Sequence, residues 1–197
     1  MTDAEREIVE GLRRGDEAAC RVLLTTQGPR LLAVARRLVG EHDAADALQD
    51  AMLNALRQIQ SFRGEARLAT WLHRITVNAC LARMRRAHTR LEGSIEDLLP
   101  EFDTTGHRLD ISPGWPELPE DAAARHEIRE VVRRCVARLP DGYREVFVLR
   151  DVEGLAGVEV ADMTGLSTNA VKIRLHRARQ ALRTMVEAEL KGSEAWL

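Results

Sequence analysis

The stretch from Leu139 to Arg179 constrains the fold of this chain most, because its pattern predicts a helix-turn-helix. Gly165 suits a position with positive φ, and Ser167 is a natural N-cap for a helix that begins at Thr168. Apolar side chains recur at helical spacing in that second helix, at Val171, Leu175, Ala178 and Leu182. Basic side chains lie between them, and residues 163–186 contain no Asp or Glu. A helix with one apolar and one purely basic face suits a phosphate-lined groove, so we predict that it binds nucleic acid.

The charges of the chain are separated into blocks, although its formal net charge is only -2. A second window without acidic residues spans 66–91 and contains six arginines. Residues 92–121 contain nine Asp and Glu residues against one Arg. This basic, acidic, basic order indicates two separate cationic surfaces with an acidic segment between them.

Helical periodicity covers nearly all of the chain outside the acidic segment, and no segment alternates convincingly at period two. We expect Asp3 to cap the first helix and Asp16 to cap the next. We also expect a turn at Gly28-Pro29 and a helix end at Gly40. A long helix is predicted from about Leu68 to Arg86.

Periodicity fails from about Leu91 to Asp121, where several prolines and glycines occur. Such a segment is too long for a connection inside a compact domain, so it divides two helical units. We therefore predict an all-α chain of two small helical domains, residues 1–90 and 122–190. An extended acidic linker at 91–121 joins them, and a tail follows at 191–197.

Several classes of protein are disfavoured by what the sequence lacks. No early apolar run resembles a signal peptide and no stretch approaches the length of a membrane span, so we expect a cytoplasmic protein without membrane contact. The three cysteines lie far apart, and no Cys/His cluster suggests zinc. No phosphate-binding glycine loop, HExxH or nucleophile elbow is present. We expect no catalytic site, no metal and no cofactor.

Two stretches of the chain contain distinctive motifs. The first contains DAADALQD at 43–50, SFRG at 61–64 and TWLHRITVN at 70–78, and the second runs from Leu139-Pro140 to Arg179. The first stretch is similar to region 2, and the second to region 4, of bacterial RNA polymerase sigma factors. This resemblance points to the sigma-70 family and its compact extracytoplasmic-function (ECF) group. The resemblance implies a factor that binds core RNA polymerase and directs promoter-specific initiation.

The resemblance implies that the helix at 43–58 docks on a coiled coil of the clamp in the largest polymerase subunit. Asp46, Gln49 and Asp50 are spaced i, i+3 and i+4, so they share one face of this helix. The candidate polymerase-binding residues are Asp46, Gln49, Asp50, Leu53 and Asn54. A merely solvated acidic face is the alternative when the residues are taken without the resemblance.

The segment that follows resembles the part of region 2 that opens the −10 promoter element. A base read there must leave the stack and enter a pocket, and the separated strand needs a basic groove. The resemblance assigns the pocket loop to residues 62–66 and places Asn78 near the flipped base. The candidate −10 residues are Phe62, Arg63, Gly64, Glu65, Ala66, Arg74, Asn78, Arg83, Arg85 and Arg86. For Phe62 and Trp71, packing in the core is the alternative.

The last predicted helix resembles the one that binds the −35 element as duplex DNA. In helix-turn-helix docking the start of the second helix meets base edges in the major groove. The resemblance assigns base reading to Lys172, His176 and Arg177, while phosphate contact is the safer role for any single arginine. The candidate −35 residues are Ser167, Asn169, Lys172, Ile173, Arg174, His176, Arg177 and Arg179.

The C-terminal half alone also resembles DNA-binding domains of response regulators. A stand-alone helix-turn-helix regulator that binds operator DNA without joining polymerase is therefore the alternative function. The N-terminal half favours the sigma factor, because it carries the clamp-docking motif and lacks the strand and helix alternation of a receiver domain. The resemblance further implies an anti-sigma factor as a partner, besides core polymerase and promoter DNA.

Overall fold

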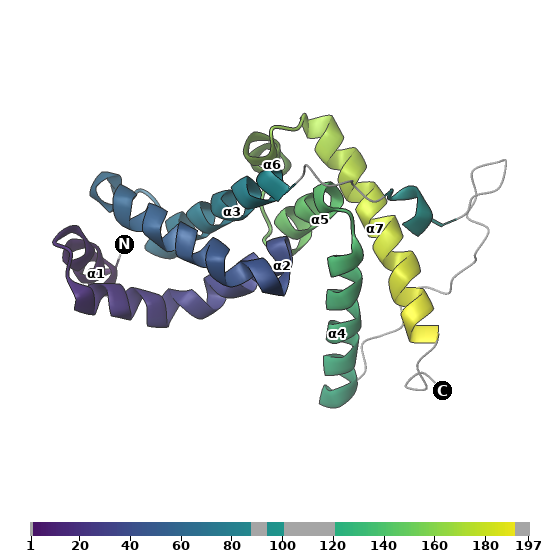
Figure 1. Cartoon of the computed structure of the whole chain (residues 1–197), viewed down its shortest axis with the longest axis horizontal. Coiled ribbons are helices and arrows are strands. Elements are labelled where there is room, and N and C mark those ends of the chain that lie inside the picture. The colour runs from purple at the N-terminus through teal and green to yellow at the C-terminus, as the bar shows by residue number, and fades with distance from the viewer. Residues whose placement is uncertain (1, 88–93, 101–120, 192–197) are drawn as a thin grey trace. The chain divides into compact units, whose positions relative to one another are not determined.

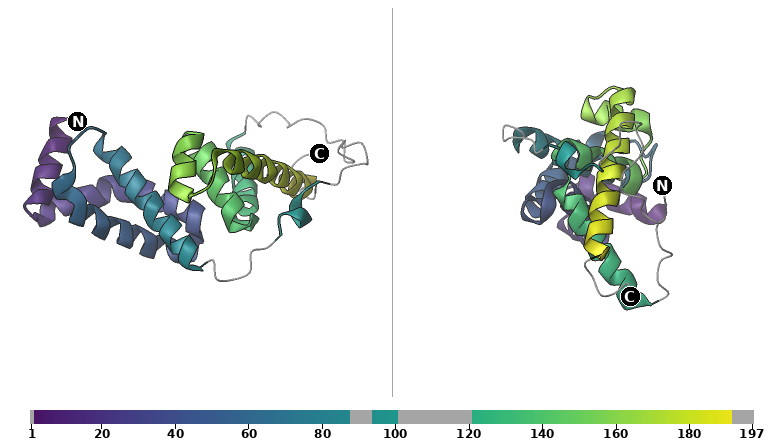
Figure 2. Two further views of the ribbon diagram at one scale, coloured as in Figure 1. Left: turned by 90° about the horizontal axis from the view of Figure 1, so that it is seen from above. Right: turned by 90° about the vertical axis from the view of Figure 1, so that its right-hand side faces the viewer.

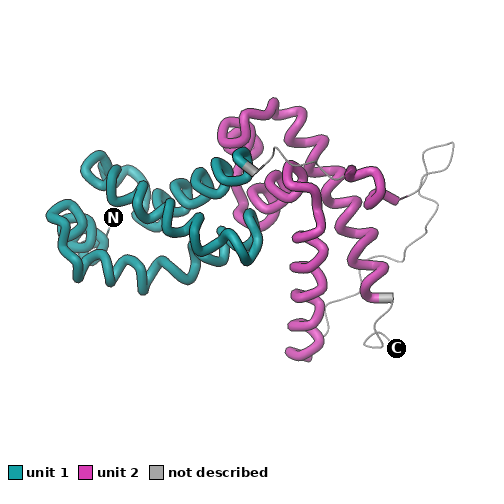
Figure 3. The backbone as a smooth tube through the Cα atoms, viewed as in Figure 1, with its two compact units in different colours: residues 1–90 teal, residues 91–197 magenta. Residues whose placement is uncertain are grey.

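The computed structural model describes residues 2–87, 94–100 and 121–191. Within these ranges the chain forms helices and no strand, which confirms the predicted all-α fold (Figure 1). The chain divides into two compact units, residues 1–90 and 91–197 (Figure 3). None of the helices in the described ranges combines the length and the apolarity needed to span a bilayer.

Unit 1 contains α1 (Asp3–Arg13), α2 (Glu17–Gln58), the short 3-10 turn η1 (Ile59–Ser61) and α3 (Leu68–Ala87). Helix α2 turns back on itself, so it contributes two arms, with α3 packed against it (Figures 1 and 2). The reversal occurs at Gly40, whose φ of 81° and ψ of 172° are not helical. The helix end expected at Gly40 is therefore confirmed, because glycine adopts this conformation without steric strain.

Two expectations for the first helices were wrong. Thr2 rather than Asp3 is the N-cap of α1, since its side chain accepts a hydrogen bond from the amide of Glu5. Gly28-Pro29 is not a turn, because α2 continues through both residues. Proline removes one backbone hydrogen bond from a helix and disfavours its continuation. Here buried residues on both sides of it, Leu23 and Leu31, keep the helix packed against the core.

The core of unit 1 lies between the two arms of α2, α1 and α3. Its buried residues include Val9 and Leu12 of α1, Leu31 of α2, and Leu68 and Leu72 of α3. This packing places the start of α3 beside the end of α2, so the connecting residues 62–67 lie at one end of the bundle next to α1.

Unit 2 contains η2 (Glu96–Leu98), α4 (Ala122–Arg138), α5 (Asp141–Phe147), a π-helical turn η3 (Val148–Val152), α6 (Gly157–Thr164) and α7 (Thr168–Lys191). Helix α7 packs against α4, α5 and α6 (Figures 1 and 2). The predicted helix-turn-helix is confirmed: α6 ends at Gly165 with φ 74°, and the Ser167 hydroxyl accepts a hydrogen bond from the amide of Ala170 at 3.1 Å.

Residues 94–100, expected as part of the linker, pack against α7. Ile95 is only 2% exposed and belongs to the same core as Val131 of α4 and Ala178 of α7. The start of the acidic segment is therefore part of unit 2. Residues 91–93 and 101–120 of the expected linker lie outside the described residues, as does most of the tail at 191–197.

Candidate nucleic-acid and polymerase interfaces

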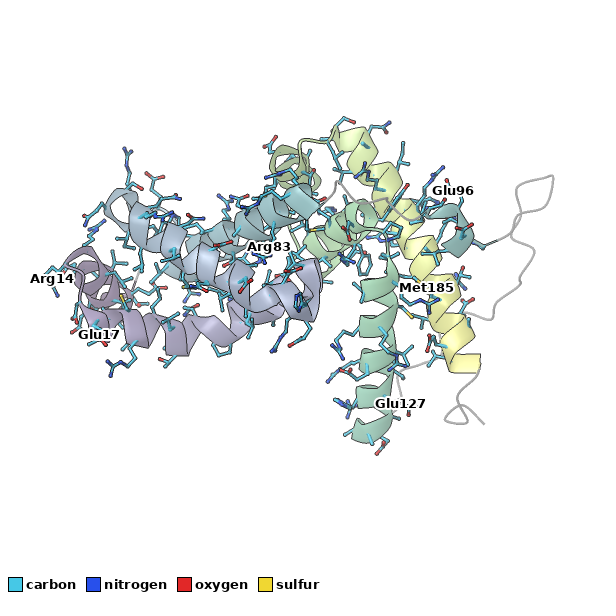
Figure 4. The ribbon with its side chains drawn as sticks, viewed as in Figure 1. Arg14, Glu17, Arg83, Glu96, Glu127 and Met185 are labelled. Carbon is cyan, nitrogen blue, oxygen red and sulfur yellow. The ribbon has the colours of Figure 1, made fainter. Side chains whose placement is uncertain are left out.

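The second arm of α2 presents an acidic face that is joined to α3 by one arginine. Arg83 of α3 (Figure 4) lies 3.0 Å from the Asp43 carboxylate and 2.9 Å from that of Asp46. A third carboxylate, that of Asp50, lies 3.8 Å from the same guanidinium. The hydrogen bond to Asp43 makes the largest contribution to raising the pKa of Arg83. Arg83 was predicted to contact the backbone of the melted −10 strand. In the structure it binds instead to the acidic face that is predicted to bind polymerase.

The residues predicted to bind polymerase lie together on that arm. Asp46 and Gln49 are exposed, and Asp50 and Asn54 are half-buried, while Ala47, Ala51 and Ala55 face the core. Leu53 is 45% exposed, and Leu56, one turn further on, is 39% exposed. Leu56 and Asp43 were not among the predicted residues, although the i, i+3 spacing from Leu53 and Asp46 points to both.

The loop predicted to form the −10 pocket contains one buried side chain. Phe62 is only 4% exposed, and its ring centroid lies 5.0 Å from that of Trp71. The alternative prediction, that Phe62 and Trp71 pack in the core, is therefore confirmed. The other side chains of the loop, Arg63, Glu65 and Ala66, are exposed, and Gly64 adopts a φ of 75°.

A pocket of about 510 Å³ lies between this loop and α1. Residues of α1, among them Arg6, Glu10 and Arg13, form one wall, and residues 60–64 form the other. The guanidinium of Arg13 donates to the carbonyl oxygen of Phe62 at 2.6 Å and to that of Ile59 at 3.4 Å. Arg13 was not predicted as a site residue, because no local pattern indicates a contact across more than forty residues.

The remaining candidates for −10 binding lie on α3. Arg74, Asn78 and Arg85 are exposed at spacings of four and seven residues, so they share one side of the helix. Arg86 is also exposed, and its Nε donates to the Ala82 carbonyl oxygen at 3.2 Å. This side presents positive charge and one amide, the groups that bind backbone phosphate and base edges.

The first half of α7 presents its predicted base-reading residues outward. Asn169, Lys172 and His176 are exposed, whereas Val171, Leu175 and Ala178 are buried, as the periodicity predicts. Ser167 is exposed at the turn, and Ile173 is 50% exposed, which leaves it accessible to a thymine methyl group.

The three candidate arginines of α7 contact other residues of unit 2. Arg177 lies 3.0 Å from the carboxylate of Glu96, which Figure 4 shows beside α7. Arg179 donates two hydrogen bonds of 2.7 Å to Asp151, and Arg174 lies over the ring of Tyr143 at 5.9 Å. The hydrogen bonds to Tyr143 and Asp151 are the leading causes that raise the pKa of Arg177 and of Arg179, respectively. These partners come from other elements, so helical spacing alone does not reveal them.

Each of the two units contains a segment that matches a known protein family. Residues 23–90 match the model of sigma-70 region 2, and residues 129–182 match that of sigma-70 region 4. The chain belongs to the sigma-70 family. It is an ECF sigma factor, a subunit associated with RNA polymerase. The sigma-70 family is not a class of enzymes.

Relatives of this sigma factor cover nearly its whole length. It is 30% identical to the ECF RNA polymerase sigma-E factor of Escherichia coli K12 over 187 residues, which is 93% of this chain and 94% of that protein. The sigma-E factor of Salmonella typhimurium LT2 is 29% identical over the same shares of both chains. Both similarities extend beyond the two matched regions.

Two solved structures resemble the fold. CnrH, solved in complex with the cytosolic domain of CnrY, matches with a TM-score of 0.52 and 27% identity over 94% of this chain and 99% of that chain. The sigma factor RpoE of Bartonella quintana, solved with the anti-sigma factor NepR, matches with a TM-score of 0.53 and 21% identity over 85% and 96%. The second likeness bears on the fold alone.

Proposed function

We propose that this sigma factor brings core RNA polymerase to promoters through its two units, unit 1 and unit 2. The acidic face of α2 binds the clamp coiled coil of the largest polymerase subunit. Loop 62–66 and the basic side of α3 hold the melted −10 strand, and α7 enters the major groove of the −35 element. The outward basic face at the start of α7 carries this proposal, since it is what duplex readout requires.

Run-off transcription with purified core polymerase and genomic promoter fragments tests the proposal. We expect transcripts that begin at defined sites when the chain is added to core polymerase and no such transcripts from core polymerase alone. A stand-alone regulator, the less favoured alternative, would bind some of these fragments without producing transcripts. The promoter sequences selected in this experiment would also define the −35 and −10 elements.

Replacement of Arg177 by Ala should weaken recognition of the −35 element by about 1–3 kcal/mol, the usual contribution of a good base contact. The loss should be confined to one base position, because a bidentate arginine selects guanine. Fluorescence anisotropy of duplexes that differ at single −35 positions measures this. Arg183→Ala is the matched control, since Arg183 lies later on α7 and pairs with Glu187 at 2.7 Å. An equal loss on all duplexes would instead assign Arg177 to phosphate.

Replacement of Asn78 by Ala should lower open-complex formation more than it lowers binding to core polymerase. The exposed amide of Asn78 can donate to and accept from a flipped base, and its removal should weaken capture of that base by about 1–3 kcal/mol. Permanganate reactivity of unpaired thymines reports opening, and anisotropy of labelled protein reports polymerase binding. Equal losses in both measurements would contradict a role in the pocket.

We infer that an anti-sigma factor covers the polymerase-binding face of unit 1. Two observations support a protein partner: the structural relative CnrH was solved in complex with the cytosolic domain of CnrY, and Leu53 and Leu56 are exposed beside the acidic face of α2. Polymerase and an anti-sigma factor would then compete for one surface. The setting of this competition is the cytoplasm, where polymerase and promoter DNA meet.

A further inference from the structure

We propose that Arg13 of α1 is a positioning residue that holds the −10 loop in the shape needed to capture a base. This inference rests on the proposed function, because it concerns the loop assigned there to the melted strand. Arg13 lies at the end of α1, outside the part of the chain that matches sigma-70 region 2.

Hydrogen bonds of Arg13 connect α1 to the point where the loop begins. These hydrogen bonds between Arg13 and residues 59–62 are called the tie below. Its guanidinium donates to the carbonyl oxygens of Ile59 and Phe62, and the Gln60 side-chain amide donates back to the Arg13 carbonyl oxygen at 2.9 Å. The Ile59 carbonyl oxygen also accepts from the Phe62 amide at 3.2 Å, and the Phe62 carbonyl lies just past the end of η1, where carbonyl groups carry partial negative charge. A guanidinium forms strong, charge-assisted hydrogen bonds with such groups.

The tie acts together with the burial of Phe62. The Phe62 ring is held in the core against Trp71, while the Phe62 carbonyl is held by Arg13. Both the side chain and the backbone of the last residue before the exposed part of the loop are therefore fixed. Residues 63–66 leave from this fixed point, and their path depends on it.

Helix α1 is itself a rigid support for the tie. Val9 and Leu12 are buried in the core that contains Phe62, and the capping box of Thr2 and Glu5 closes the start of the helix. Near the other end, a Cβ on Gly11 would lie only 2.6 Å from the Cβ of Ala19, so α1 approaches α2 closely. Helix α1 therefore cannot move without disturbing its packing against α2 and the core.

The tie also bounds the pocket of about 510 Å³ between α1 and residues 60–64. A loop beside an open pocket has little to pack against on that side, so hydrogen bonds to its backbone decide its position. Arg13 lies in the pocket wall and donates to the loop backbone, so it helps to set their separation, together with the Gln60 side chain and the pair of Arg67 with Glu5 at 3.9 Å.

Hydrogen exchange of the free, full-length chain tests the tie itself. In Arg13→Ala we expect the Phe62 amide, which donates to the Ile59 carbonyl oxygen at 3.2 Å, to exchange about tenfold faster, the effect of losing roughly one charge-assisted hydrogen bond at this turn. Arg14→Ala is the matched control, because Arg14 (Figure 4) is the exposed neighbour on the same helix end, and it should leave exchange unchanged. Unchanged exchange in Arg13→Ala would overturn the proposal.

Transcription assays test what the tie does. We expect Arg13→Ala to lower open-complex formation about tenfold and to reduce discrimination among bases at the flipped −10 position, with affinity for core polymerase unchanged. Arg13→Lys should recover part of both, since an ammonium can donate to these carbonyls without the geometry of the guanidinium. Equal losses in opening and polymerase binding, or faster exchange without a change in opening, would overturn the positioning role. If the wild-type chain does not distinguish bases at that position, the proposed −10 function fails, and the exchange experiment still decides the tie.

Discussion

Replacement of Asp50 by Arg should abolish binding of the chain to core RNA polymerase while unit 1 stays folded. The Asp50 carboxylate lies 3.8 Å from the guanidinium of Arg83, which also binds Asp43 and Asp46. An arginine at position 50 would place two like charges together and reverse the charge at the centre of the face proposed to dock on the clamp. Loss of one partner from a hydrogen-bonded charge pair at an interface typically costs about 2–5 kcal/mol, most of it through faster dissociation.

Fluorescence anisotropy of labelled protein with core polymerase measures this loss. The Asp50 side chain is 47% exposed, so its replacement should leave thermal unfolding of the chain nearly unchanged. Glu7→Arg is the matched control, because Glu7 is an exposed acid on α1 of the same unit and the charge change is the same. Unchanged affinity of Asp50→Arg for polymerase would show that the acidic face of α2 is only a solvated surface.

Replacement of Phe62 by Ala should destabilise unit 1 by about 3–5 kcal/mol, the usual effect of removing a large aromatic side chain from a core. Phe62 is 4% exposed and belongs to the cluster that includes Val9, Leu68 and Leu72. Its removal leaves a cavity and ends the contact with Trp71, in which the ring centroids are 5.0 Å apart. A large fraction of the stability of a small domain would be lost.

Urea denaturation followed by circular dichroism measures the free energy of unfolding in this experiment. Arg63→Ala, at the exposed neighbouring position, should change it by no more than about 0.5 kcal/mol. Phe62→Leu should retain most of the stability, since it keeps an apolar side chain of similar size in the cavity. If Phe62→Ala were as stable as the wild type but defective in promoter opening, Phe62 would act in the pocket and not in the core.

The features that the sequence determined by itself are local ones. Ser167 caps α7, Asp16 caps α2 and Gly165 ends α6 with a positive φ, all as expected. Each of these features depends on hydrogen bonds and backbone conformations within a few residues, so the residues that decide them are adjacent in the sequence. Helical periodicity likewise predicts which face of α7 is buried, because every fourth position lies on the same side.

Tertiary structure decided the features that join distant residues. Packing of Leu23 and Leu31 carries α2 through Pro29, against the local preference of proline. Packing of α3 on α2 brings Arg83 to Asp43, and the docking of residues 94–100 on α7 brings Glu96 to Arg177.

The same holds for the tie between Arg13 and Phe62, which lie 49 residues apart in the sequence. A charged side chain on a helix surface has no preferred partner in its own sequence neighbourhood beyond three or four residues. Its partner is whichever group the packed helices place within reach. The sequence therefore determined the helices, most of their caps and their faces, and only the packing of those helices decided which distant group each of these arginines binds.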